Sequence, residues 1–136
     1  MKHRAADVAL AVKRLQHRHH RALSQALAPL GLSLVQWDTL RHLHRQPDAS
    51  LHDLAVLTFQ TDQSFGSLAV RMAERGLIER IAGPGRAVRH QLTDEGARLR
   101  AEGQELVDAI TDQSFSALSA AQLDQLGDLL AAALGQ

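Results

Sequence analysis

The sequence lacks cysteine altogether, and only 3% of its residues are aromatic. Without cysteine there is no disulfide, no thiolate nucleophile and no thiol redox switch. With so few aromatic residues, the core must be built from Leu, Val, Ile and Ala. No apolar run is long enough to span a bilayer, and charges occupy the place of a signal peptide's apolar stretch. We therefore expect no membrane partner and a cytoplasmic location.

An excess of either charge is also missing, since 15 Lys and Arg balance 15 Asp and Glu. This balance argues against a uniformly basic nucleic-acid-binding protein. The charges are nevertheless segregated along the chain: residues 1–21 carry six Lys or Arg against one Asp, and residues 71–90 carry five Arg against two Glu. From 92 to the end, eight acidic residues face two Arg. Two basic regions thus precede an acidic C-terminal third.

The 136 residues fit a single domain whose pattern is mostly helical. Apolar residues at helical spacing predict a long helix over 5–28, ended by a Pro and a Gly. Cap patterns predict four further helix starts, and a polar break at 60–62 precedes one more helix. A Gly and Pro loop between two short apolar runs predicts a hairpin. The expected order is four helices, a hairpin and two helices. The later elements are helices from 33 to before 47, after 50 and from 62 to 75, strands over 77–82 and 88–92, and helices after 93 and 119.

Several segments in this order resemble the MarR family of bacterial transcription regulators. The similar segments are LGLSLVQWDTLRHL at 30–43, SLHDLAVLT at 50–58, LAVRMAERGLIER at 68–80 and RAVRHQLTDEG at 86–96. The resemblance implies a mainly α fold with a small β-hairpin wing (α+β), a winged helix-turn-helix with N- and C-terminal dimerisation helices. Residues 1–136 would then be one winged-helix domain, with a DNA-binding lobe at about 33–92 and dimerisation helices at 1–30 and 93–136. One departure lies in the wing, where Pro84 stands in place of the family's Asp two residues before Arg86.

The fourth helix is the predicted DNA-reading element. If its apolar side faces inward, the 100° step per residue turns its polar side outward. Gln and Arg can form bidentate pairs with adenine and guanine, Ser can bond to bases or phosphate, and Val can touch thymine methyls. A solvated helix face would have a similar pattern, but the adjoining hairpin and basic cluster favour DNA. The predicted contacts from this helix and the turn before it are Gln60, Thr61, Gln63, Ser64, Ser67, Val70 and Arg71.

Two arginines of the hairpin complete the predicted DNA-binding set. Arg86 follows the turn residues, where a long cation can enter a narrow, electronegative minor groove, in keeping with the family resemblance. Arg89 is placed to bind a phosphate. A solvated hairpin is the alternative interpretation of both side chains.

The eight histidines raise the question of a metal or effector site. A metal site needs three or four converging ligands, and the spacing of His17 and His20 supplies two at most, so we predict no metal. The family resemblance implies a pocket for a small, often aromatic or acidic, effector, with His17, Trp37 and His42 as candidate lining residues; Trp37 also fits a core position. We find no catalytic motif and predict neither an enzyme nor a cofactor.

The sequence thus predicts a homodimeric repressor that binds a pseudo-palindromic operator in double-stranded DNA and is released by a small effector. A single helix-turn-helix makes too few contacts for tight binding, which favours a dimer reading two half-sites. Two alternatives stay open. One is a metal-responsive regulator, and the other is a winged-helix protein-interaction module that barely touches DNA.

Overall fold

The computed structural model describes residues 2–82, 85 and 88–136. Within them the chain forms six α-helices, one short 3-10 helix and a two-stranded antiparallel hairpin, in the predicted order. The elements are α1 (Ala5–Leu27), η1 (Ala28–Leu30), α2 (Leu34–Arg45), α3 (Leu51–Leu57), α4 (Asp62–Glu74), β1 (Ile78–Ala82), β2 (Val88–Leu92), α5 (Asp94–Ser114) and α6 (Ala120–Ala133).

The predicted helix starts are confirmed by their capping geometry. At α2, Ser33 Oγ accepts from Gln36 N while the Gln36 side chain accepts from Ser33 N. The same reciprocal pairs open α3 at Ser50 and α6 at Ser119. Because each box satisfies two backbone donors that a helix leaves free, these short polar patterns fix where the helices begin.

The predicted hairpin is confirmed as well. Ile78 pairs with Leu92 at its base and Ala82 pairs with Val88 near its tip. Ser50 forms a further isolated bridge to Arg89, so the chain before α3 lies against the outer side of β2. Gly83, Pro84, Arg86 and Ala87 in the loop lie outside the described residues, and with them the predicted contact of Arg86.

One apolar core joins the helix-turn-helix, the hairpin and the two long helices. Phe65 and Met72 of α4, Leu54 of α3 and Ile78 of β1 are nearly inaccessible to solvent. Leu27 of α1 and Leu99 of α5 belong to the same cluster. The long helices are therefore partly built into the lobe that holds α4, and this fixes the lobe's orientation on them.

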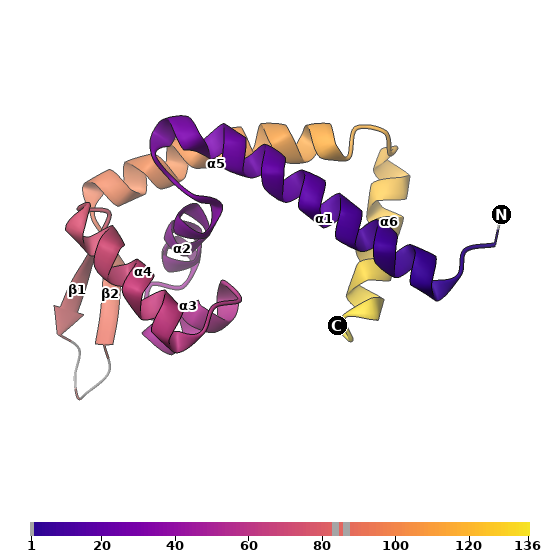
Figure 1. Cartoon of the computed structure of the whole chain (residues 1–136). Coiled ribbons are helices and arrows are strands. Elements are labelled where there is room, and N and C mark those ends of the chain that lie inside the picture. The colour runs from indigo at the N-terminus through magenta and orange to yellow at the C-terminus, as the bar shows by residue number, and fades with distance from the viewer. Residues whose placement is uncertain (1, 83–84, 86–87) are drawn as a thin grey trace.

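The outer parts of α1 and α6 form a separate region with little core of its own. Figure 1 shows α6 beside the N-terminal half of α1, away from the hairpin. Residues 2–14 are all exposed, and α6 has no buried residue. An apolar groove of about 380 Å³ runs between the two helices, lined among others by Val12, Leu126 and Leu130. These helices carry more apolar surface than the single chain covers.

Each helix within residues 2–82, 85 and 88–136 is too short or too polar to span a bilayer.

Candidate nucleic-acid interface

Helix α4 is held by a polar cap at its start and a left-handed glycine after its end. Thr61 Oγ1 accepts from Ser64 N at 3.1 Å, which caps the first turn. Gly76 has a φ of 73°, a conformation that costs glycine little and lets the chain turn from α4 into β1. The apolar side of α4 is buried against α3 and β1, so the helix has one fixed outward face.

That outward face carries the side chains that the sequence predicts for DNA reading. Gln63, Ser67 and Arg71 are exposed along α4, and Thr61 and Ser64 are exposed at its start. Gln60 is half-buried in the turn before the helix. The predicted contacts of α4 and of the turn before it therefore lie on the side of the helix that faces away from the core.

Several of these side chains are engaged within the helix. Ser64 Oγ donates to Gln60 Oε1 at 2.9 Å, and Ser67 Oγ donates to the Gln63 carbonyl at 3.3 Å. These bonds orient the hydroxyls without burying them. Within the described residues no carboxylate lies within salt-bridge distance of Arg71, so its guanidinium is available to an anion.

Val70 is 58% exposed, and it also borders a groove that the sequence did not indicate. It lines a groove of about 330 Å³ between α4 and the hairpin, together with Ala69, Val88 and His90. His90 is buried at 5% exposure, and its Nδ1 has no hydrogen-bond partner among the described residues. Burial, with the Arg80 charge adding to it, lowers the pKa of His90 below its ordinary value. Val70 of α4 and the buried His90 of β2 therefore line the same groove.

Arg89 of β2 packs against the chain that precedes α3 and does not extend freely from the hairpin. Its residue is half-buried, and its backbone forms the bridge to Ser50. Hydrogen bonds from Ser50 lower the pKa of the Asp53 carboxyl, and the charge of Arg89 lowers it further. Arg89 is thus a cation beside the N-terminus of α3.

A contact missed by the sequence reasoning links the two helices of the helix-turn-helix. His52 Nδ1 lies 2.8 Å from Asp62 Oδ1, joining α3 to the first residue of α4. The carboxylate raises the pKa of His52 above its ordinary value, by hydrogen bonding first and by charge second. No local pattern signals this pair, because its partners are ten residues apart on different helices.

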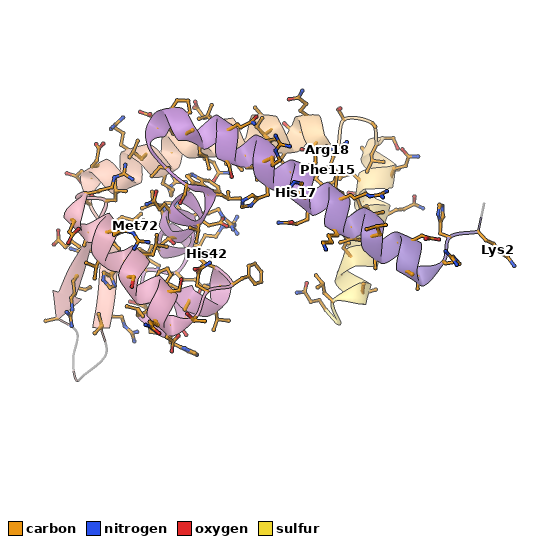
Figure 2. The ribbon with its side chains drawn as sticks, in the orientation of Figure 1. Lys2, His17, Arg18, His42, Met72 and Phe115 are labelled. Carbon is orange, nitrogen blue, oxygen red and sulfur yellow. The ribbon has the colours of Figure 1, made fainter. Side chains whose placement is uncertain are left out.

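The three predicted effector residues do not converge. Trp37 is a core residue, 2% exposed, and its indole Nε1–H donates to the Arg100 carbonyl at 3.1 Å. It borders a cavity of about 330 Å³ between α1, α2 and α5. Neither His17 nor His42 lines that cavity; Figure 2 shows them on α1 and α2 respectively. The residues around Trp37 are His19, Leu23, Leu34, Asp38, Arg41, Arg45, Gln104 and Val107.

His42 and the other histidines form no metal-binding group in the described part of the chain. No three His, Asp or Glu side chains come together there as a metal site would require. His42 instead lies beside Arg41, with 3.5 Å between Nε2 and Nη2, and burial and that charge lower the pKa of His42.

Comparison with known proteins gives a consistent assignment. The model of the MarR family matches residues 30–87, from the end of η1 into the hairpin loop. A mutant MarR from E. coli complexed with operator DNA is 20% identical, with 93% of each chain covered and a TM-score of 0.85. CouR from Rhodococcus jostii RHA1 bound to p-coumaroyl-CoA is 25% identical, covering 92% of this chain and 89% of that one, with a TM-score of 0.82.

A third structure, a Mycobacterium tuberculosis MarR family protein in complex with salicylic acid, is 25% identical, with 95% of each chain covered and a TM-score of 0.75. The family match covers the helix-turn-helix and the first wing strand, and the structural likeness extends it over both long helices. The chain thus resembles the MarR family of winged-helix transcription regulators over residues 30–87, and it shares the fold of the MarR family structures along most of its length.

Proposed function

We propose that this protein is a homodimeric repressor that binds a pseudo-palindromic operator through the outward face of α4. The observation that carries the proposal is the exposure of Gln63, Ser67 and Arg71 on one side of a helix whose other side is fixed in the core. The E. coli MarR structure with operator DNA, which shares the fold, supports the same interpretation. The protein would act in the cytoplasm as a binding protein and not as an enzyme.

In this proposal α4 enters the major groove and the hairpin lies toward the adjacent minor groove. Gln63 and Arg71 would read base edges, while Thr61, Ser64 and Ser67 would contact bases or phosphates near the start of the helix. Val70 would touch thymine methyls with the part of its side chain that faces away from the hairpin groove. Gln60 would position Ser64, and Arg86 and Arg89 would supply the hairpin's cations.

The proposal divides the single domain 1–136 into two working parts. Residues 33–92 would form the DNA-binding lobe, and 1–30 with 93–136 would form the dimerisation helices. The apolar groove between α1 and α6 supports this division, because a second copy would cover surface that one chain leaves exposed. Two copies would then present two α4 helices to half-sites about one turn of DNA apart.

Selection of bound sequences from random DNA tests the proposal directly. A pair of inverted half-sites is expected, and affinity for the selected site should fall steeply as salt rises, because phosphate contacts release counterions. Arg71→Ala should weaken specific binding by about 1–3 kcal/mol. Arg4→Ala, at the far end of α1, is the matched control. Affinity that ignores both salt and Arg71→Ala would reject operator binding and favour a protein-interaction module.

We further propose that a small aromatic acid binds the cavity beside Trp37 and alters DNA affinity. The cavity combines apolar walls from Leu23 and Val107 with the cations Arg41 and Arg45. Arg41 is partly committed, since it bonds to Asp38 and lies 5.6 Å from the Trp37 ring centre. Arg45 is therefore the better partner for a carboxylate. The salicylic acid of the M. tuberculosis structure supports this ligand class, and the p-coumaroyl-CoA of CouR supports an aromatic group in the ligand.

Trp37 is the only tryptophan in the sequence, so its fluorescence reports on this cavity. Titration with salicylate should change the emission, and Arg45→Ala should weaken the response at least several-fold. His44→Ala, at the exposed neighbouring position, should leave the response intact. An unchanged response in Arg45→Ala would remove the carboxylate site from the proposal.

A further inference from the structure

The ion pair between α3 and α4 lies at the edge of the proposed DNA-binding face. His52 Nδ1 and Asp62 Oδ1 are 2.8 Å apart, yet their side chains remain 69% and 63% exposed. Asp62 is the first residue of α4 and stands between Thr61 and Gln63 of the proposed interface. The pair is thus both well formed and open to a ligand.

We propose that His52 contacts a DNA phosphate through its Nε2–H, and that Asp62 orients the ring for this contact. The inference rests on the proposed operator binding and adds a residue to it. His52 would contact the DNA backbone and strengthen binding to any DNA sequence, whereas α4 reads the bases.

The geometry of the ring supports this role. With Nδ1 turned to Asp62, Nε2 lies on the opposite edge of the imidazole, and no hydrogen bond from it to another described residue is present. An unpaired carboxylate at the start of α4 interacts favourably with the positive end of the helix dipole, but it repels DNA phosphates. A cationic His52 neutralises the carboxylate charge and leaves its Nε2–H as a donor for the phosphate.

The charges around His52 favour its protonated form. Asp62 on α4 is the main influence, and Asp53 on α3 adds to it. Arg89 on β2 lies near Asp53 and is the nearby cation of the hairpin. The pKa of His52 therefore lies above its ordinary value of 6.5. A phosphate raises it further, so binding takes up protons and affinity should fall as pH rises through this range.

Operator affinity measured from pH 6 to 8.5 at constant salt tests the contact. A single linked proton changes affinity by at most tenfold per pH unit. We expect wild type to lose roughly three- to tenfold more affinity across the range than His52→Gln. His44→Gln, which removes an exposed histidine of α2, should follow wild type. Asp62→Asn should move the pH dependence to lower pH by releasing the His52 proton more easily.

Titration of the His52 ring by NMR without DNA separates the two levels of the proposal. In wild type the ring should titrate above 6.5, and in Asp62→Asn its pKa should fall. If wild type binds an operator but His52→Gln keeps the same pH profile, the phosphate contact is wrong and operator binding stands. If wild type binds no operator at any pH, the proposed function fails and the contact fails with it. A ring pKa unmoved by Asp62→Asn would overturn the positioning role of Asp62.

Discussion

Phe59 combines two unfavourable features at the end of α3. Its φ is 58°, and its side chain is 95% exposed. The surrounding hydrogen bonds, from Gln60 N to the Ala55 carbonyl and from Phe59 N to the Val56 carbonyl, form a helix end that requires a left-handed residue at this position. Glycine or asparagine usually fills it, because a left-handed conformation costs other residues roughly 1–2 kcal/mol.

Phe59→Asn should therefore stabilise the fold by up to about 1 kcal/mol, since it relieves the backbone and gives up no buried contact. Urea unfolding at constant protein concentration measures the change. Val56→Asn, an exposed apolar position within regular helix, is the matched control and should bring no gain. A lower midpoint for Phe59→Asn would show that the ring makes a stabilising contact in the assembled protein.

At Gly96 we expect a substitution to destabilise the fold, because the packing leaves no room for a side chain there. A Cβ at Gly96 would overlap the backbone carbonyl of Leu77, whereas a Cβ at Gly66 of α4 would meet nothing within 4 Å. We expect Gly96→Ala to lower the free energy of unfolding by about 1–3 kcal/mol. Gly66→Ala should instead raise it by about 0.5–1 kcal/mol through helix propensity. Thermal unfolding of the two variants under one condition compares them, and equal effects would contradict the close contact.

The hairpin and α4 share a buried histidine whose titration should be visible in their stability. The pKa of His90 is lower in the folded protein than the ordinary 6.5. The unfolded chain therefore takes up a proton before the folded one does, and stability should be complete above about pH 6.5 and fall below it. Hydrogen exchange of the β1 and β2 amides at pH 7.5 and 5.5 follows this loss.

His90→Leu removes the titrating group together with its Nδ1, and it should reduce the loss of stability at acid pH. His52→Gln gives the contrast, because a raised pKa stabilises below the ordinary value and its removal should lower stability at acid pH. A hairpin that loosens equally in wild type and His90→Leu would assign the effect to another group.

Most of the elements could be predicted from the sequence because their signals are local. The caps at Ser33, Ser50 and Ser119 act within three residues, and the apolar spacing of α4 fixes which face is buried. The outward face of α4 follows from that spacing alone. The chemistry around it does not, since the His52 pair and the position of Arg89 arise from contacts between elements.

The cavity beside Trp37 was beyond prediction for the same reason. The sequence indicated a core tryptophan, which the structure confirms, but His19 and Gln104 reach it from α1 and α5. Three helices far apart in the sequence define that space. Neighbouring residues such as His17 and His42 share the helices without lining it.

At the end of the molecule opposite the hairpin, several large apolar side chains of α1 and α6 are exposed to solvent. Leu129 of α6 and Leu134 directly after this helix are 69% and 72% exposed, and Val12 of α1 is 50% exposed. Burying a leucine is worth about 1.5–3 kcal/mol, and a two-fold interface counts each change twice. If a second copy covers this surface, one charged substitution there should separate the subunits while each lobe keeps its own core.

Leu129→Asp should thus weaken dimerisation by about 3–6 kcal/mol, a factor of at least a hundred in the dissociation constant. Sedimentation at several protein concentrations measures it, and circular dichroism checks that the helices remain. Gln125→Asp adds the same charge to an exposed polar position of α6 and should leave the assembly unchanged. The separated variant should also lose most of its operator affinity, because one lobe reads only one half-site. A Leu129→Asp protein that stays dimeric would place the subunit interface elsewhere on the chain.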